Sequence, residues 1–116
     1  MPAGLLAAAQ DEKRRAFRQR VLLGGKIVFE HGCMNIDCTL RNLSLYGAKL
    51  SLPPGSVTPD RFEMIEMRNG KLYDCRVIWR EYPYLGVAFE KTIDLQDAAE
   101  PHHRTLKRLW LDCLVR

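Results

Sequence analysis

Two short polar segments carry the residue types best suited to ligand chemistry. The first is KRRAFRQR at 13–20, in which five of the eight residues are Lys or Arg. A guanidinium group is planar, permanently charged and forked, so it binds phosphate through two bonds and also recognises the O6/N7 edge of guanine. Arg14 and Arg18 are four residues apart and share one side of the segment whether it is helical or extended. This clustering favours an anionic partner more than the total charge does.

The second segment is NLSLYG at 42–47, between two apolar runs. The Asn42 amide both donates and accepts hydrogen bonds and so can pair with a base edge, and Ser44 adds a hydroxyl. Gly47 permits a positive φ and lets a ligand or another strand approach closely. These are also ordinary turn residues, and a basic run before a domain is commonly a solvated tail. On residue types alone, both interpretations stay open.

Other polar residues do not assemble into a catalytic or metal-binding pattern. Ser44 has no base placed beside it, His31 lies in an expected turn, and His102 and His103 adjoin the tail as surface residues. The four cysteines form no CxxC pair, and two of them, Cys38 and Cys75, fall on the apolar phase of strands as buried free thiols. We predict no enzymatic activity, no metal site and no cofactor.

Period-two alternation dominates the middle of the chain. It predicts six short strands joined by hairpin-type turns, and the aromatic residues Phe29, Tyr73, Trp79 and Phe89 take inward positions, whereas Val28 takes the outer face with Lys26 and Glu30. The expected strands lie at about 25–30, 35–41, 48–52, 62–67, 73–80 and 85–89. Because no helix separates them, parallel crossovers are excluded. The pattern predicts an all-β fold over residues 21–90, an antiparallel β-barrel or sandwich of six strands.

The tail changes period, which predicts a C-terminal α-helix over 102–114. Its apolar residues recur at helical spacing, with Pro101 suited to the first turn. They are Leu106, Leu109, Trp110, Cys113 and Leu114. We expect this face to pack on the barrel. A dimerisation or partner-docking helix is the alternative, because Leu111 and Val115 widen the apolar face.

Length and composition indicate one globular domain. The chain has 116 residues, 47% of them hydrophobic, with a net charge of +4 and a pI of about 9.0. The apolar N-terminal run lacks the positive region of a signal peptide, and no stretch approaches the length of a membrane span. Together with the unpaired cysteines, this predicts a cytoplasmic location. We expect a tail over 1–11, one domain over 12–116, and a flexible basic N-terminal arm that a ligand orders.

The two polar segments together resemble a known family. Arg14 and Arg18 match an RxxxR motif, and Asn42, Ser44 and Gly47 match [D/N]xSxxG. This ordered pair, followed by a strand pair and a terminal helix, resembles the PilZ domain family over about residues 12–116. The resemblance implies a six-stranded barrel with a C-terminal helix that binds the bacterial second messenger cyclic di-GMP.

The resemblance also implies roles for the motif residues. Arg14 and Arg18 would hold phosphates and guanine edges, Asn42 and Ser44 would reach other guanine contacts, and Gly47 would keep the turn. Arg15 is a further ligand-binding candidate. It lies within the RxxxR segment, and Arg20 follows that segment by two residues. Which of the four arginines contact ligand therefore stays open.

The predicted function is a non-catalytic receptor that relays a cyclic di-GMP signal to a downstream protein partner. One alternative is a PilZ-type adaptor that docks proteins without ligand. Another is a basic β-barrel that binds single-stranded nucleic acid, a class that stacks bases on exposed aromatic residues. The inward positions assigned to the strand aromatics disfavour that class, so no DNA or RNA partner is expected.

Overall fold

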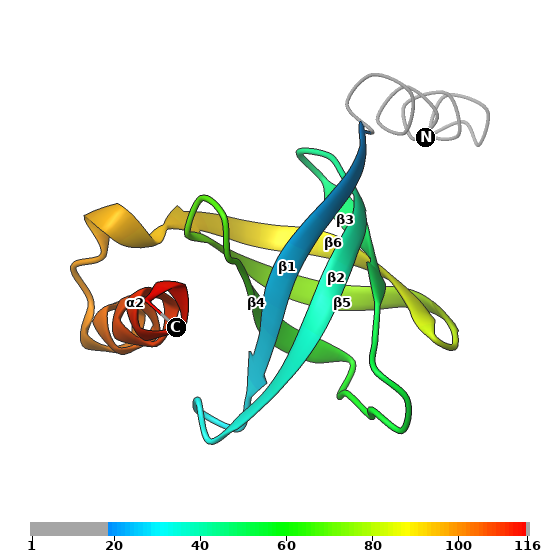
Figure 1. Ribbon diagram of the computed structural model, residues 1–116, viewed down its shortest axis with the longest axis horizontal. Helices are drawn as coiled ribbons and strands as arrows, with labels where there is room; N and C mark the ends of the chain where they lie inside the picture. The colour runs from blue at the N-terminus through cyan, green and yellow to red at the C-terminus, as the bar shows by residue number, and fades with distance from the viewer. Residues whose placement is uncertain (1–18, 116) are drawn as a thin grey trace, which may run out of the picture.

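The computed structural model describes residues 19–115, which form six strands, a short 3₁₀ helix and one α-helix (Figure 1). The strands are β1 (Gln19–Phe29), β2 (Met34–Leu43), β3 (Gly47–Ser51), β4 (Arg61–Glu66), β5 (Lys71–Glu81) and β6 (Tyr84–Asp94). The helices are η1 (Leu95–Asp97) and α2 (Pro101–Leu114). The tail at 1–11 and the predicted arm up to Arg18 lie outside the described residues.

Every strand pairs with its neighbours in the antiparallel sense. The hydrogen-bonded order is β1-β2-β3-β6-β5-β4, and β4 pairs back onto β1, so the sheet closes on itself. The turn at 30–33 uses three consecutive residues with positive φ: Glu30, His31 and Gly32. Gly70, at φ 70°, ends the loop between β4 and β5. The predicted six antiparallel strands and C-terminal helix are confirmed.

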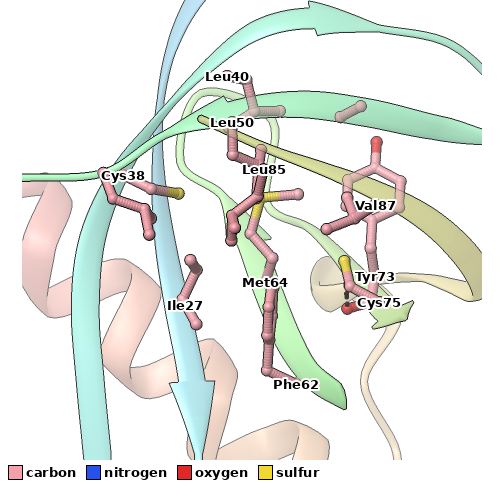
Figure 2. Close-up of a cluster of buried hydrophobic side chains, with 12 residues drawn as sticks. Ile27, Cys38, Leu40, Leu50, Phe62, Met64, Tyr73, Cys75, Leu85 and Val87 are labelled. Atoms are coloured by element: carbon pink, nitrogen blue, oxygen red, sulfur yellow. Dashed lines mark hydrogen bonds between the residues drawn. The ribbon is translucent and has the colours of Figure 1, made fainter. Parts of the chain in front are cut away.

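The interior of the closed sheet holds the main hydrophobic core. Figure 2 shows its labelled side chains, which come from all six strands and point toward one another. The core residues are Ile27, Cys38, Leu40, Ala48, Leu50, Leu52, Phe62, Met64, Tyr73, Cys75, Leu85 and Val87. Phe29 and Phe89 are half-buried and pack against this core. The predicted buried thiols at Cys38 and Cys75 are therefore confirmed.

A second hydrophobic core lies on the outer face of the sheet beneath α2. Val28, Ile65 and Leu72 pack there against Leu95 and the helix. Val28 lies on the outer face, as predicted together with Lys26 and Glu30, but it is only 1% exposed because α2 covers it there. Helix α2 covers that part of the sheet, so the strands below it are buried on both faces.

Helix α2 docks through its predicted apolar face, beside β4 in Figure 1. The Trp110 indole Nε1 donates a hydrogen bond to the Met67 carbonyl at 2.7 Å, and its ring lies against Gly70, where a Cβ would approach it to 2.5 Å. The prediction that the helix packs on the sheet is confirmed. Leu111 and Val115 are exposed, so the docking alternative stays a prediction. Of the helices within residues 19–115, none has the length and apolarity to span a bilayer.

Asp94 gives the stability of the fold a specific pH dependence. A hydrogen bond from Lys71 Nζ, at 3.1 Å, lowers the pKa of its carboxyl, and the backbone N–H of Gln96 adds to this effect. A depressed folded-state pKa stabilises the protein above the unfolded pKa, about 3.9, and this stability is lost as pH falls through the folded value. Asp94→Asn should therefore unfold at lower urea concentration than wild type at pH 7. Urea midpoints that differ equally at pH 7 and pH 2.5 would contradict this origin.

Candidate ligand-binding site

The predicted polar turn lies at one end of a depression on the outer face of β2, β3, β6 and β5. Paired residues on neighbouring strands share a face of the sheet. One row across the strands runs Asn42, Lys49, Gly86, Trp79. The adjacent row runs Gly47, Ala88, Arg76. Together with the loop before β3 they line an open cavity of about 720 Å³, within the range of small-molecule sites.

Small residues form the floor of this cavity. Gly86 and Ala88 lie within the two rows and Gly47 lies at the end of the second, and larger side chains such as Lys49, Arg76 and Trp79 lie beside them. A Cβ at Gly47 would collide with the backbone carbonyl of Val87 in β6, which confirms the predicted close approach of another strand. The predicted use of a positive φ at Gly47 is wrong, because its φ is not positive. Gly47 is required by the strand beside it rather than by a left-handed backbone.

The Ser44 hydroxyl shapes the turn between β2 and β3. Its Oγ accepts hydrogen bonds from the backbone N–H groups of Tyr46 and Gly47, both at 3.1 Å, and donates to the Gly47 carbonyl at 3.2 Å. The Phe89 N–H donates to the Tyr46 carbonyl at 2.8 Å and ties the loop to β6. The turn-forming interpretation of Ser44 therefore accounts for its hydrogen bonds. A direct contact between Ser44 and ligand stays a prediction.

Asn42 faces the cavity with one half of its amide already fixed. Its Oδ1 accepts the Lys49 N–H at 3.1 Å, at the point where the register between β2 and β3 shifts. Within residues 19–115 the Nδ2 group has no acceptor. The amide is thus held by its oxygen and presents two N–H donors. Such donors suit the acceptor atoms of a base or a phosphate.

Trp79 is exposed, and its predicted inward position is wrong. The side chain is 39% exposed and lines the cavity, with its indole lying over Gly86. A β-bulge between Val77 and Trp79 adds one residue to β5, and the extra residue turns the following side chain to the other face. Three successive apolar residues, Val77, Ile78 and Trp79, break the alternation and are the sequence signal for this bulge.

Two cationic side chains stand on opposite sides of the floor. Lys49 projects from β3, with its Nζ 4.4 Å from the centre of the Tyr84 ring, and Arg76 projects from β5. Sequence reasoning missed both, because each has the type and phase of an ordinary surface residue. Arg20 pairs with Asn42 across β1 and β2, so the first described residues of β1 lie beside the cavity row.

The structure thus brings together three of the predicted site residues. Asn42, Ser44 and Gly47 line one cavity, as the motif interpretation requires. Arg14, Arg15 and Arg18 lie outside the described residues, although Arg18 directly precedes Gln19 at the start of β1.

The described residues offer little for thiol or metal chemistry. Burial raises the pKa of the Cys38 thiol to about 12 and also raises that of Cys75, so both thiols are protonated at neutral pH. Nowhere in residues 19–115 do three or more His, Cys, Asp or Glu side chains form a metal-binding group. The His102 ring contacts Glu63 at 2.6 Å and joins α2 to β4. The features that remain for recognition are donors, cations and one exposed indole around a small-residue floor.

Comparison with known proteins gives one family. The family model described as PilZ domain matches residues 12–110, which include every predicted site residue. No curated protein matches the sequence significantly.

Proposed function

The chain belongs to the PilZ domain family, and from this membership we propose that it is a non-catalytic receptor for cyclic di-GMP. The observation that carries the proposal is the cavity in which Asn42, Ser44 and Gly47 meet an exposed indole. The family is known for binding this dinucleotide, and the ligand offers two phosphates and two guanine bases. Each chemical part of it has a suitable partner in or next to the cavity.

Trp79 supplies a surface on which a base can stack. Its indole rests on Gly86, and one side of the ring is therefore supported while the other faces the cavity. A base stacked on an aromatic side chain contributes about 1–3 kcal/mol. The Asn42 Nδ2 group can donate to base acceptors from the same row of residues. This arrangement supports recognition of a nucleobase.

The basic arm supplies the charges for the phosphates. Arg20 pairs with Asn42 across β1 and β2, and Arg18 lies two residues before Arg20 in the chain. We propose that Arg14 and Arg18 bind the phosphates and guanine edges, with Arg15 as a further contact, and that ligand orders the arm. Binding would then change the surface around the cavity and relay the signal to a protein partner.

Titration calorimetry with cyclic di-GMP tests the proposal. Wild type should bind, and Trp79→Ala should bind about tenfold or more weakly, because it removes the stacking surface. Trp79→Phe should recover part of the loss, since a smaller ring still stacks. Thermal melting should differ little between the variants, because the indole lies outside both cores. Absence of binding by wild type at high micromolar ligand would leave the ligand-independent adaptor as the function.

A further inference from the structure

Arg76 lines the cavity on the same strand and the same face as Trp79. It lies in the same row as Gly47 and Ala88, and the bulge in β5 brings Trp79 onto the same face. Two residues of strand separate Arg76 from Trp79, one of them the bulged Ile78, so their Cα atoms are roughly 7–10 Å apart. The long Arg76 side chain can therefore reach the edge of a base stacked on the indole.

The Arg76 guanidinium is also unpaired within residues 19–115. Its neighbours are engaged: Arg80 donates to Thr58, Pro59 and Asp60, and Arg61 pairs with Glu90. Arg76 lies directly opposite Arg61 in the pairing of β4 and β5. Like charges in opposed positions are unfavourable. Arg76 therefore adds no favourable charge pair to the fold. A ligand with acceptor atoms would give its guanidinium N–H groups hydrogen-bond partners.

We propose that Arg76 selects guanine, by donating two hydrogen bonds to the O6/N7 edge of the base stacked on Trp79. This inference rests on the proposed function and extends it to a residue outside both motifs. A fork of N–H donors fits the two guanine acceptors, whereas adenine presents a donor at the position of O6. A phosphate contact would serve both dinucleotides alike, so losing it would lower both affinities and leave their ratio unchanged. The two roles are therefore separable by substitution.

The experiment compares cyclic di-GMP with cyclic di-AMP on wild type, Arg76→Lys and Arg76→Gln. Wild type should prefer cyclic di-GMP, and Arg76→Gln should reduce the ratio of the two dissociation constants about tenfold or more. Arg76→Lys, whose ammonium still donates to O6 and N7 but without the planar fork, should reduce the ratio less. Cyclic di-IMP keeps O6 and N7 but lacks the 2-amino group. Between wild type and the Arg76 variants, the affinity for cyclic di-IMP should therefore fall by the same factor as the affinity for cyclic di-GMP. Melting temperatures should not fall, because Arg76→Gln removes an unfavourable charge opposite Arg61 and Arg76→Lys leaves the charge unchanged.

Arg68→Gln is the matched control, since it removes an exposed arginine from the β4–β5 loop outside the cavity. It should leave the ratio unchanged. If wild type binds and discriminates but Arg76→Gln keeps the full ratio, Arg76 does not read the base and the inference is overturned. If wild type binds neither dinucleotide, the receptor function itself fails and takes this inference with it.

Discussion

Replacing Gly47 with alanine will lower the free energy of unfolding by about 2 kcal/mol or more. The new Cβ would collide with the Val87 carbonyl, and the next nearest atoms also belong to the β6 backbone. Backbone cannot rotate away as a side chain does, so β3 and β6 must separate where Gly47 pairs with Ala88. For a domain of this size the melting temperature should fall by about 10 °C.

Gly86→Ala is the matched comparison, because it adds the same methyl group to the same cavity floor. There the obstructing atoms belong to the Trp79 indole, an exposed side chain that can move. Gly86→Ala should therefore weaken cyclic di-GMP binding with a smaller loss of stability. Urea denaturation of both variants measures the difference. Equal stability losses would show that the β3–β6 contact is not what requires glycine at position 47.

The close approach of another segment to Gly47 was predictable from the sequence, but its physical basis, a neighbouring strand and not a positive φ, was not. A glycine after a polar turn commonly takes a positive φ, and the residue types around it are those of a turn. Which strand lies beside Gly47 depends on the strand order, in which β3 pairs with β6 and Gly47 pairs with Ala88, 41 positions later in the chain. Local composition carries no information on that neighbour.

The phase of β5 was predictable as far as Val77. Tyr73 and Cys75 took their predicted inward positions, and the bulge after Val77 then reversed the phase for Trp79. Alternation assumes one residue per pairing position, so a single extra residue inverts the inference that follows it. Trp79 therefore lies outside, where it gives the candidate site an aromatic surface, and three of the four strand aromatic residues keep inward positions.

Val28 illustrates a second limit of the alternation pattern. On the outer face of the strand, Val28 has the charged residues Lys26 and Glu30 as its neighbours, so the local sequence gives no signal that it is buried. Its burial follows from α2, whose residues Leu106 and Trp110 lie about 80 positions later in the chain. The helix itself was predictable from its period, but the place where it docks was not.

The double substitution Arg14→Ala/Arg18→Ala should weaken cyclic di-GMP binding by about a hundredfold or more. Each guanidinium should make a charge-assisted contact of about 1.5–3 kcal/mol, and the two together exceed the free-energy change for a hundredfold loss. Thermal stability should stay within about 0.5 kcal/mol of wild type, as is usual for substitutions of charged surface residues, which we expect these two arginines to be. Calorimetric titration and thermal melting of the same samples separate the two effects.

Arg104→Ala/Arg108→Ala removes the same charge from exposed positions on α2 and controls for net charge. If attraction by overall charge were sufficient, both double variants would lose the same affinity, and the loss would disappear at high salt. Specific contacts predict a different pattern. Added salt should weaken wild-type binding, yet the arm variant should stay weaker than the helix variant at every salt concentration. Equal affinities of these two variants would move the phosphate contacts away from the RxxxR motif and toward the cations in the cavity, Lys49 and Arg76.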